Sequence, residues 1–275
     1  MRKRSTVNNW LTAIALLLFC TIDAKADNKP ENSNTSAQSA TEYVSGIYNK
    51  INFCREARLN PAVFETAYRG YTNLRAAGKL NTGNEIISIA DYSLSSNTKR
   101  LWIIDLHSKK VLLNTYVAHG QGTGEEFATA FSNRENSHQS SLGFYVTGQT
   151  YMGEHGLSLH LHGMDNGYNS AAYQRAVVLH GAAYVSEDFI KSNQRLGRSW
   201  GCPAVATELS AQIIKTVKDG TCLFIYHPDK KYLASSYWLH KKGNKLQDEM
   251  YQNQFQLSIP QQPDGNESKQ LVVHQ

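Results

Sequence analysis

Short runs of β-branched and aromatic residues fill the middle of this chain and constrain its fold more than any other feature. Each run is bounded by turn-forming residues, which is typical of β-strands rather than helices. Two runs, 100–106 and 111–119, are separated by only four polar residues and predict a hairpin. The other runs cover residues 85–92, 142–148, 157–161, 176–180 and 222–226. The sequence therefore predicts a mainly β fold.

Helical signals flank the strands. Asn60 as an N-cap, Pro61 in the first turn and Gly78 as a stop enclose apolar residues at helical spacing. A weaker helical pattern at 41–53 precedes this helix, so residues 41–80 are predicted to be a short N-terminal helical segment. Peripheral helices are also predicted at 186–193 and 208–219.

Both ends of the chain lack the patterns of a folded core. Basic residues at 2–4, an apolar run at 10–19 and the small residues Ala24 and Ala26 predict a secretory signal peptide. The apolar run is shorter than the roughly 20 residues that a membrane-spanning helix needs. The predicted organisation is a signal peptide (1–26), a disordered leader (27–40), a helical segment (41–80), a β domain (81–228) and a polar C-terminal extension (229–275).

The charge of the chain limits its partners. The formal net charge is +5, and removal of residues 1–26 takes away four basic residues and one acidic residue, which leaves +2. No block of Lys and Arg then remains of the kind that binds a phosphate backbone. We therefore expect no nucleic-acid partner.

Three cysteines follow the predicted signal peptide: Cys54, Cys202 and Cys222. Export leads to an oxidising compartment, where an odd number of cysteines leaves at least one thiol unpaired. A disulfide between Cys54 and Cys222 would leave Cys202 free, but the distance along the sequence does not test that pairing.

Cys202 and His180 both lie next to residues that permit tight turns. Cys202 stands between Gly201 and Pro203, and His180 ends an apolar run before Gly181. A thiol becomes a useful nucleophile as a thiolate, and a nearby imidazole can take its proton. Backbone N–H groups in such a turn can stabilise an oxyanion. The pattern favours acyl transfer through a thioester; the alternative is a buried Cys and a core His without a catalytic role.

This segment resembles the catalytic domain of bacterial L,D-transpeptidases. That family carries His-Gly, a spacer, and then Ser/Thr-His-Gly-Cys. The present chain carries His180-Gly181, seventeen further residues, and then Ser-Trp-Gly-Cys at 199–202. The motif is fairly specific because several small or reactive residues must keep their spacing.

The resemblance extends upstream of the motif. Residues 100–124 are similar to the opening hairpin and small-residue loop of the family, and residues 140–148 to its Thr-Pro-x-Gly-x-Phe element. The similarity covers roughly 100–226. It implies that the β domain, 81–228, is an L,D-transpeptidase-like β-barrel or sandwich catalytic domain with peripheral helices.

Two positions depart from the usual family pattern. Trp200 stands where the family has a second His, and Pro203-Ala204 replaces the usual pair after the Cys. Residues 197–204, Gly-Arg-Ser-Trp-Gly-Cys-Pro-Ala, resemble a divergent branch of the family with Gly-Arg-Ser-x-Gly-Cys-Pro-Ala. We therefore expect altered specificity rather than altered chemistry, with Trp200 as a loop residue of the site.

The resemblance implies a role for the residues of this segment. Cys202 would attack a carbonyl of a peptide stem, and His180 would act as general base and later as general acid. Backbone N–H groups near Gly201 and Cys202 would hold the oxyanion. A backbone carbonyl is expected to orient His180. Ser199 would position the turn or bond the thiolate.

Four further residues are candidates for contact with substrate. Arg198 could meet a substrate carboxylate or could only brace its loop. Gly181 lies next to the base. His119 and Tyr151 lie in glycine-rich loops that could line a cleft, although both could equally be turn residues.

A metal site is the alternative for one pair of histidines. His160 and His162 share one face of a predicted strand, and together with His180 they could supply three ligands. No Asp, Glu or Cys lies at compact metal spacing near them. We therefore expect no metal and no other cofactor.

The resemblance implies a cysteine-dependent L,D-transpeptidase that acts on peptidoglycan. Its substrate would be the diaminopimelate-containing tetrapeptide stem, and the acyl group would pass to an amine of a second stem or of a wall-anchored protein. Alternatives are an L,D-carboxypeptidase, which trims the same stems with water, and a non-catalytic peptidoglycan-binding protein on the same scaffold. After signal removal the protein would lie in the periplasm or cell envelope, without a membrane span.

Overall fold

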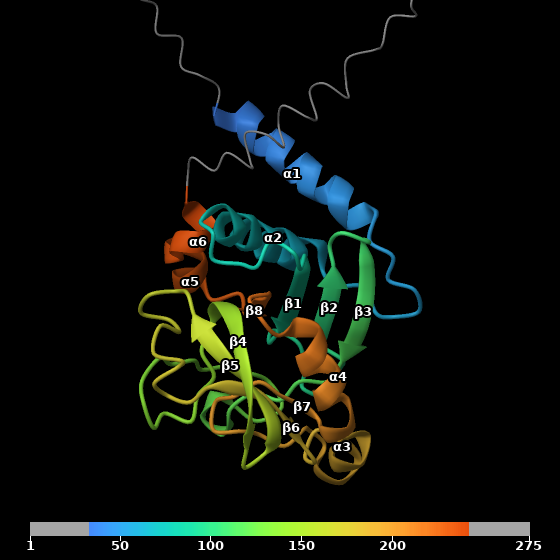
Figure 1. Cartoon of the computed structure of the whole chain (residues 1–275), viewed down its shortest axis with the longest axis vertical. Helices are drawn as coiled ribbons and strands as arrows, with labels where there is room; N and C mark the ends of the chain where they lie inside the picture. The colour runs from blue at the N-terminus through green and yellow to red at the C-terminus, as the bar shows by residue number, and fades with distance from the viewer. Residues whose placement is uncertain (1–32, 242–275) are drawn as a thin grey trace, which may run out of the picture. The chain divides into compact units, whose positions relative to one another are not determined.

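The structure is a computed structural model that describes residues 33–241 (Figure 1). The predicted signal peptide, most of the predicted leader and residues 242–275 of the predicted extension lie outside the described residues. From Asn34 onward the described residues belong to one compact unit. Within the described range, no helix is both long enough and apolar enough to cross a membrane.

The strands in this range form a single sheet in the order β3-β2-β1-β8-β4-β5-β6-β7. β1 pairs with β8 and β6 pairs with β7 in parallel, and the other neighbours are antiparallel. Ala118, just beyond β3, bridges Ala204 in β7, so the two edges of the sheet approach each other as in a nearly closed barrel. The strands are β1 (Ile86–Asp91), β2 (Leu101–Asp105), β3 (Lys110–Thr115), β4 (Gly143–Gly153), β5 (Gly156–Gly163), β6 (Val178–Ala182), β7 (Ala204–Ala206) and β8 (Cys222–Tyr226).

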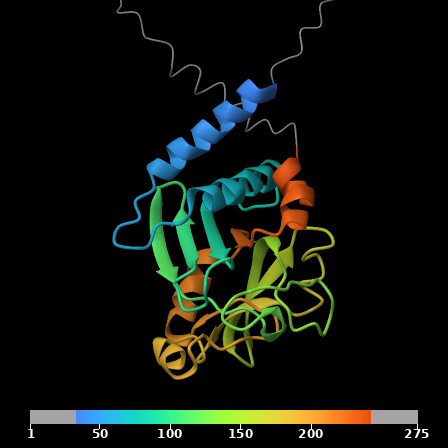
Figure 2. The ribbon, with the colours of Figure 1, turned by 180° about the vertical axis from the view of Figure 1, so that it is seen from behind.

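Short helices lie around this sheet. They are α1 (Ser33–Asn49), α2 (Pro61–Ala76), the 3-10 turn η1 (Gln121–Thr123), α3 (Glu187–Asn193), α4 (Thr207–Val217), α5 (Lys230–Ser235) and α6 (Tyr237–His240). Figures 1 and 2 show α2 next to β1 and α6 from both sides. The predicted mainly β fold with peripheral helices is confirmed.

α2 forms where the capping signals indicate a helix. Asn60 Oδ1 accepts a hydrogen bond from Ala62 N at 2.8 Å, and Pro61 occupies the first turn. A Cβ on Gly70 would collide with the ring of Phe144, so a glycine at this point lets β4 approach the helix closely.

The core lies around the central strands β1, β8 and β4. Every residue of β1 is buried, which explains why apolar residues occur on both of its faces instead of alternating with polar ones. Phe144 of β4 and Phe224 of β8 stack with ring centroids 4.2 Å apart. α4 covers β6 and buries Ile213, Ile214 and Val217.

The structure departs from the sequence expectations at several element boundaries. β3 ends at Thr115, because the chain then leaves β2 and turns toward β7. β4 continues to Gly153 through a bulge between Thr147 and Thr150. β7, α5 and α6 are short elements without a strong sequence pattern and were not predicted. α1 begins at Ser33, inside the segment predicted to be disordered.

The three cysteines within residues 33–241 are unpaired. Cys54 is exposed, Cys222 is buried in β8 and Cys202 is half-buried, and all three are free thiols. The structure therefore does not contain the Cys54–Cys222 disulfide that the sequence left open.

Candidate active site

His180 is a buried residue of β6 with 2% of its surface exposed. β6 pairs it with Ser158 of β5 on one side and with Ala204 of β7 on the other. Its Nδ1 lies 2.9 Å from the backbone oxygen of Gly181. A carbonyl oxygen only accepts, so Nδ1 carries the proton and Nε2 remains as the proton acceptor. In this structure the carbonyl that orients the imidazole is therefore that of Gly181.

The surroundings of His180 keep its ring neutral. Burial lowers the pKa of His180 from its ordinary value of 6.5, and the nearby His155 lowers it further, against the effect of the hydrogen bond to Gly181 O. A neutral imidazole at pH 7 is the form that a general base needs. Gly181 is a buried residue of β6 that packs against Ser210 and Thr207 of α4.

Cys202 lies in the turn that leads into β7. Val178 N–H donates to its Sγ at 3.4 Å, and the thiol faces Ala176 O at 3.8 Å. Burial raises the pKa of the Cys202 thiol, and the Val178 N–H and the charge of Arg175 only partly oppose this rise. This environment favours the neutral thiol of Cys202 over a thiolate.

Cys202 and His180 are held by the same stretch of β6. Val178, whose N–H contacts Sγ, precedes His180 by two residues, which is about 7 Å along a strand. Among the hydrogen bonds of the described residues, none joins Sγ to the imidazole. Catalytic hydrogen bonds are often long or poorly aligned before substrate binds, so the absence of this bond does not argue against the pair.

A serine shapes the turn that carries Cys202. Gly201 N donates to Ser199 Oγ at 3.0 Å, and the same hydroxyl donates to Cys202 O at 2.6 Å. Ser140 Oγ donates to Gly201 O at 3.1 Å. Gly201 has φ +125°, a conformation that favours glycine. Ser199 thus positions the turn and does not bond the thiol.

These contacts narrow the choice of oxyanion donors. The Gly201 N–H is already engaged with Ser199, whereas the Cys202 N–H makes no hydrogen bond to any other described residue. The expected pair of donors near Gly201 and Cys202 is therefore reduced, in this conformation, to the single N–H of Cys202.

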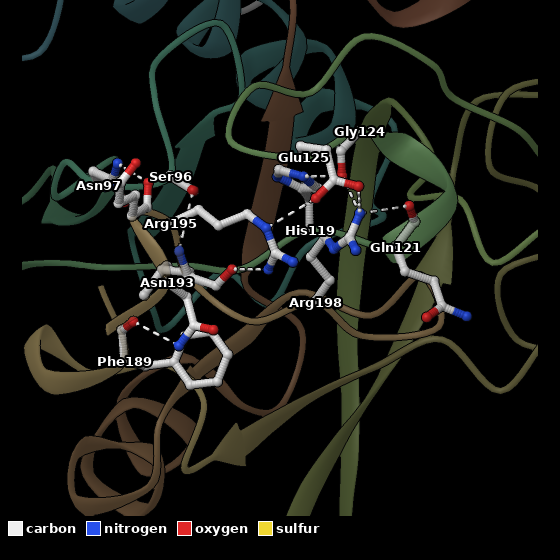
Figure 3. Close-up of polar contacts among 12 residues, drawn as sticks. Ser96, Asn97, His119, Gln121, Gly124, Glu125, Phe189, Asn193, Arg195 and Arg198 are labelled. Carbon is white, nitrogen blue, oxygen red and sulfur yellow. Dashed lines mark hydrogen bonds and ion pairs between the residues drawn. The ribbon is translucent and has the colours of Figure 1, made fainter. Parts of the chain in front are cut away.

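Arg198 holds the loop that follows β3. Figure 3 shows Arg195 and Arg198 converging on Glu125. Arg198 Nη1 lies 2.7 Å from Glu125 Oε1 and donates to Gly124 O at 2.9 Å, and Arg195 Nε lies 2.9 Å from Glu125 Oε2. The Arg198 side chain is only 20% exposed. Of its two predicted roles, these contacts support the bracing of the loop.

His119 lies in the interior and not at a cleft, contrary to its predicted position. It is 1% exposed, its Nδ1 is 2.7 Å from Arg100 Nη2, and its Nε2 is 3.3 Å from Gly124 O (Figure 3). Burial and then the charge of Arg100 lower the pKa of His119 to about 4. The neutral His119 ring therefore contacts the buried side of the loop at Gly124 and stabilises that loop.

A comparison with known families matches the model of the L,D-transpeptidase catalytic domain to residues 55–226, a range that includes His180 and Cys202. The chain belongs to this family. The L,D-transpeptidase-like fold class is thereby confirmed. The matched range starts before the predicted domain boundary at 81, so α2 falls within the family domain.

Solved L,D-transpeptidase structures are similar to this chain at low sequence identity. An L,D-transpeptidase from Mycobacterium smegmatis is 14% identical, with 54% of this chain and 61% of that chain covered and a TM-score of 0.33. L,D-transpeptidase 3 from Mycobacterium tuberculosis is 9% identical, with 52% and 62% covered and a TM-score of 0.34. The chain thus spans about three fifths of the length of these structures. No curated protein sequence matches it.

Trp200, at the position of the family's second His, does not contact His180. Its side chain is 74% exposed and stacks on His138 with ring centroids 5.1 Å apart and an interplanar angle of 8°. His138 Nδ1 lies 2.9 Å from Gln121 Nε2, which fixes the histidine ring. The Trp200 side chain therefore lies at the surface of its loop.

His155, which the sequence analysis did not single out, lies against His180. It lies in the turn between β4 and β5, and its ring stacks on that of His180 with centroids 4.3 Å apart. No local pattern marks His155, because the contact depends on how the β4–β5 hairpin folds over β6.

Arg175 is a second residue that the sequence analysis missed. Its Nη2 donates to Gln139 O at 2.7 Å and its Nη1 to Ser132 O at 2.8 Å, so the guanidinium is fixed close to the turn of Cys202. Its positive charge opposes the rise in the pKa of the Cys202 thiol. Arg175 is thus placed to stabilise negative charge on the sulfur.

Tyr151 and the histidine pair of β5 lie on the strand face next to His180. Tyr151 is 38% exposed and stacks on His160 with ring centroids 4.6 Å apart. Ser158, His160 and His162 alternate along β5 and share one face with the side chain of His180. Within the described residues, no group of three or more His, Cys, Asp or Glu side chains is arranged to hold a metal ion.

Proposed function

We propose that this chain is a peptidoglycan L,D-transpeptidase in which Cys202 is the nucleophile and His180 the general base. The observation that carries the proposal is the β6 strand, which fixes the His180 imidazole through Gly181 O and contacts Cys202 Sγ through Val178 N–H. Both residues lie in the range matched by the family model. Membership of the family supports the substrate class, a peptide stem of peptidoglycan.

The first half of the reaction forms a thioester. Cys202 Sγ attacks the carbonyl carbon between diaminopimelate and D-Ala while His180 Nε2 takes the thiol proton. Because the resting thiol is neutral, proton transfer accompanies attack and does not precede it. The Cys202 N–H stabilises the oxyanion, and Arg175 stabilises the negative charge that develops on sulfur. His180 then returns its proton to the departing amine, and D-Ala leaves.

The second half releases the acyl group. An amine of a second stem, or of a wall-attached protein, attacks the thioester and gives its proton to His180, which then reprotonates the Cys202 thiolate. If water attacks in place of the amine, the product is a tripeptide stem. The acceptor therefore decides between transfer and hydrolysis.

The same proposal places the protein in the cell envelope, where its substrate lies. The residues that support export, 1–26, are outside the described structure. Intact-mass measurement of the exported protein is expected to find Asp27 at its N-terminus. Retention of the basic residues at 2–4 would contradict cleavage.

The deciding experiment incubates the protein with disaccharide-tetrapeptides and identifies the products by mass spectrometry. A cross-linked dimer supports transfer, and a tripeptide supports hydrolysis. Cys202→Ala is expected to abolish both products, and His180→Ala to reduce turnover by a factor of about 10³ or more. Cys54→Ala and His107→Ala, at exposed positions, are the matched controls and are expected to retain activity. Turnover by Cys202→Ala would refute the proposed nucleophile.

A further inference from the structure

A surface pocket of about 370 Å³ lies beside the proposed catalytic pair, and none of the steps above uses it. It is lined by Gly148, Gln149, His160, His162, Tyr173 and Asp219. The register of the sheet links it to the nucleophile: His160 pairs with Val178, whose N–H contacts Cys202 Sγ. Its volume falls in the range of ligand pockets, about 300–1,000 Å³.

Flat rings form one wall of this pocket. Tyr173 stacks on His162 with ring centroids 5.2 Å apart and an interplanar angle of 11°, and its ring is also 5.4 Å from that of His160. Tyr151 stacks on the same His160. Tyr173 is nevertheless 55% exposed, so the row of rings presents an aromatic face to solvent.

The β4 bulge opens the floor of the pocket. The register of β4 against β5 shifts between Thr147 and Thr150, which places Gly148 and Gln149 outside the regular ladder. A Cβ on Gly148 would lie 2.7 Å from His162 Nε2, so glycine leaves room for that imidazole. The bulge turns the Gln149 side chain into the lining of the pocket.

The polar groups of the lining suit an uncharged ligand with several hydroxyl groups. The lining contains no Lys or Arg, and Asp219 Oδ2 is paired with Lys218 Nζ at 2.9 Å, which offsets its charge. An anionic ligand such as a phosphate or carboxylate would find no guanidinium or ammonium in this lining. A planar amide and two imidazoles can donate to or accept from a hydroxyl, and a carboxylate oxygen can accept from one.

We propose that this pocket is a saccharide subsite, which binds a sugar ring of the glycan that carries the stem. A pyranose has an apolar C–H face that can lie on Tyr173 and an edge of hydroxyl and amide groups that can bond Gln149, Asp219 and the imidazoles. This inference rests on the proposed function, since it assigns the part of the same substrate that lies beyond the peptide.

The distances agree with this assignment. From Val178 on β6 to Gly148 on β4 is two strand spacings, about 10 Å. In a tetrapeptide stem whose last bond is opened, the acyl group belongs to the third residue, and three extended residues span about 10 Å. A stem that reaches Cys202 with its third carbonyl is therefore long enough for its first sugar to reach this pocket.

The binding test uses a peptide-free disaccharide of N-acetylglucosamine and N-acetylmuramic acid, titrated into the full chain by calorimetry. Tyr173→Ala is expected to weaken binding about 3- to 10-fold, the range for loss of one ring contact. Tyr173→Phe keeps the ring and is expected to bind like the wild type. Tyr237→Ala removes another exposed tyrosine, 59% exposed and outside the pocket, and is the matched control. Absence of disaccharide binding by the wild type, or equal weakening by Tyr237→Ala, would overturn the subsite.

The kinetic test compares kcat/KM for a disaccharide-tetrapeptide with kcat/KM for the free tetrapeptide. The wild type is expected to prefer the disaccharide-linked stem, and Tyr173→Ala to reduce this preference about 3- to 10-fold. Turnover without preference, together with no disaccharide binding, refutes the subsite and leaves the proposed function standing. Disaccharide binding without turnover of either stem refutes the proposed function and supports the subsite. Thermal unfolding of each variant checks that it is folded.

Discussion

His155 and His180 lie face to face, with ring centroids 4.3 Å apart and an interplanar angle of 21°. His155 is exposed in the turn between β4 and β5, whereas His180 is buried in β6. A positive charge on one ring disfavours a positive charge on the other at this distance. The hairpin therefore contributes to keeping the proposed base neutral.

Replacement of His155 should move the pH dependence of the reaction. His155→Phe keeps a stacked ring and removes a group that lowers the pKa of His180, so that pKa is expected to rise. Because the reaction needs neutral His180, the acidic limb of the kcat/KM profile should shift to higher pH. His107→Phe, at another exposed histidine, should leave the limb unchanged. An acidic limb that stays in place or moves to lower pH in His155→Phe would show that His155 does not act on the base.

The charge of Arg175 should have a measurable effect on the pKa of the Cys202 thiol. Arg175 lowers the pKa of the Cys202 thiol, so Arg175→Gln is expected to raise it and Arg175→Lys to retain part of the effect. The rate of alkylation of Cys202 by iodoacetamide, followed against pH, reports this pKa because only the thiolate reacts. The midpoint should move to higher pH in Arg175→Gln. Identical profiles for the Gln and Lys variants would contradict an electrostatic role.

Loss of the Ser199 hydroxyl should affect both stability and rate. Ser199→Ala leaves the buried Gly201 N–H without its acceptor and releases Cys202 O, at an expected cost of about 1–2 kcal/mol in the free energy of unfolding. The turn then orients the Cys202 N–H less well, and kcat should fall about tenfold. Ser192→Ala, at an exposed position of α3, is the control for both measurements. Wild-type kcat in Ser199→Ala would mean that this hydroxyl does not fix the oxyanion donor.

Replacing either of two helical glycines by alanine should change the free energy of unfolding, but in opposite directions. Gly70→Ala in α2 forces a methyl group into the ring of Phe144, and overpacking of this kind lowers the free energy of unfolding by about 1–3 kcal/mol. Gly46→Ala in α1 has nothing within 4 Å of the new Cβ and should raise stability by about 0.5–1 kcal/mol through helix propensity. Urea unfolding measures both changes. A stabilised Gly70→Ala protein would disprove the close approach of α2 and β4.

The sequence predicted most strands and the α2 cap because those signals are local. The run at 222–226 became β8, and Asn60 caps its helix through its own side chain. β7 was not predicted because a strand of three residues, Ala204–Ala206, is too short to show a periodic pattern.

Other features of the site depend on contacts between distant segments, and the sequence did not reveal them. From its neighbouring glycines His119 was a candidate for either a cleft or a turn, but the buried Arg100 that pairs with it is nineteen positions away. The stack of His155 on His180 requires the β4–β5 hairpin to fold over β6. Arg175 is recognisable only once its turn is placed beside that of Cys202.

The oxygen that orients His180 is a main-chain atom of Gly181. A carboxylate or amide in that position would be encoded by a codon and could be lost in a single nucleotide change. A peptide carbonyl is retained whatever residue the gene specifies there. Inactivating mutations that act through the tautomer of the proposed base are therefore expected to displace β6, as a side chain at Gly181 would, because its Cβ would lie 2.8 Å from Ser210 Oγ in α4.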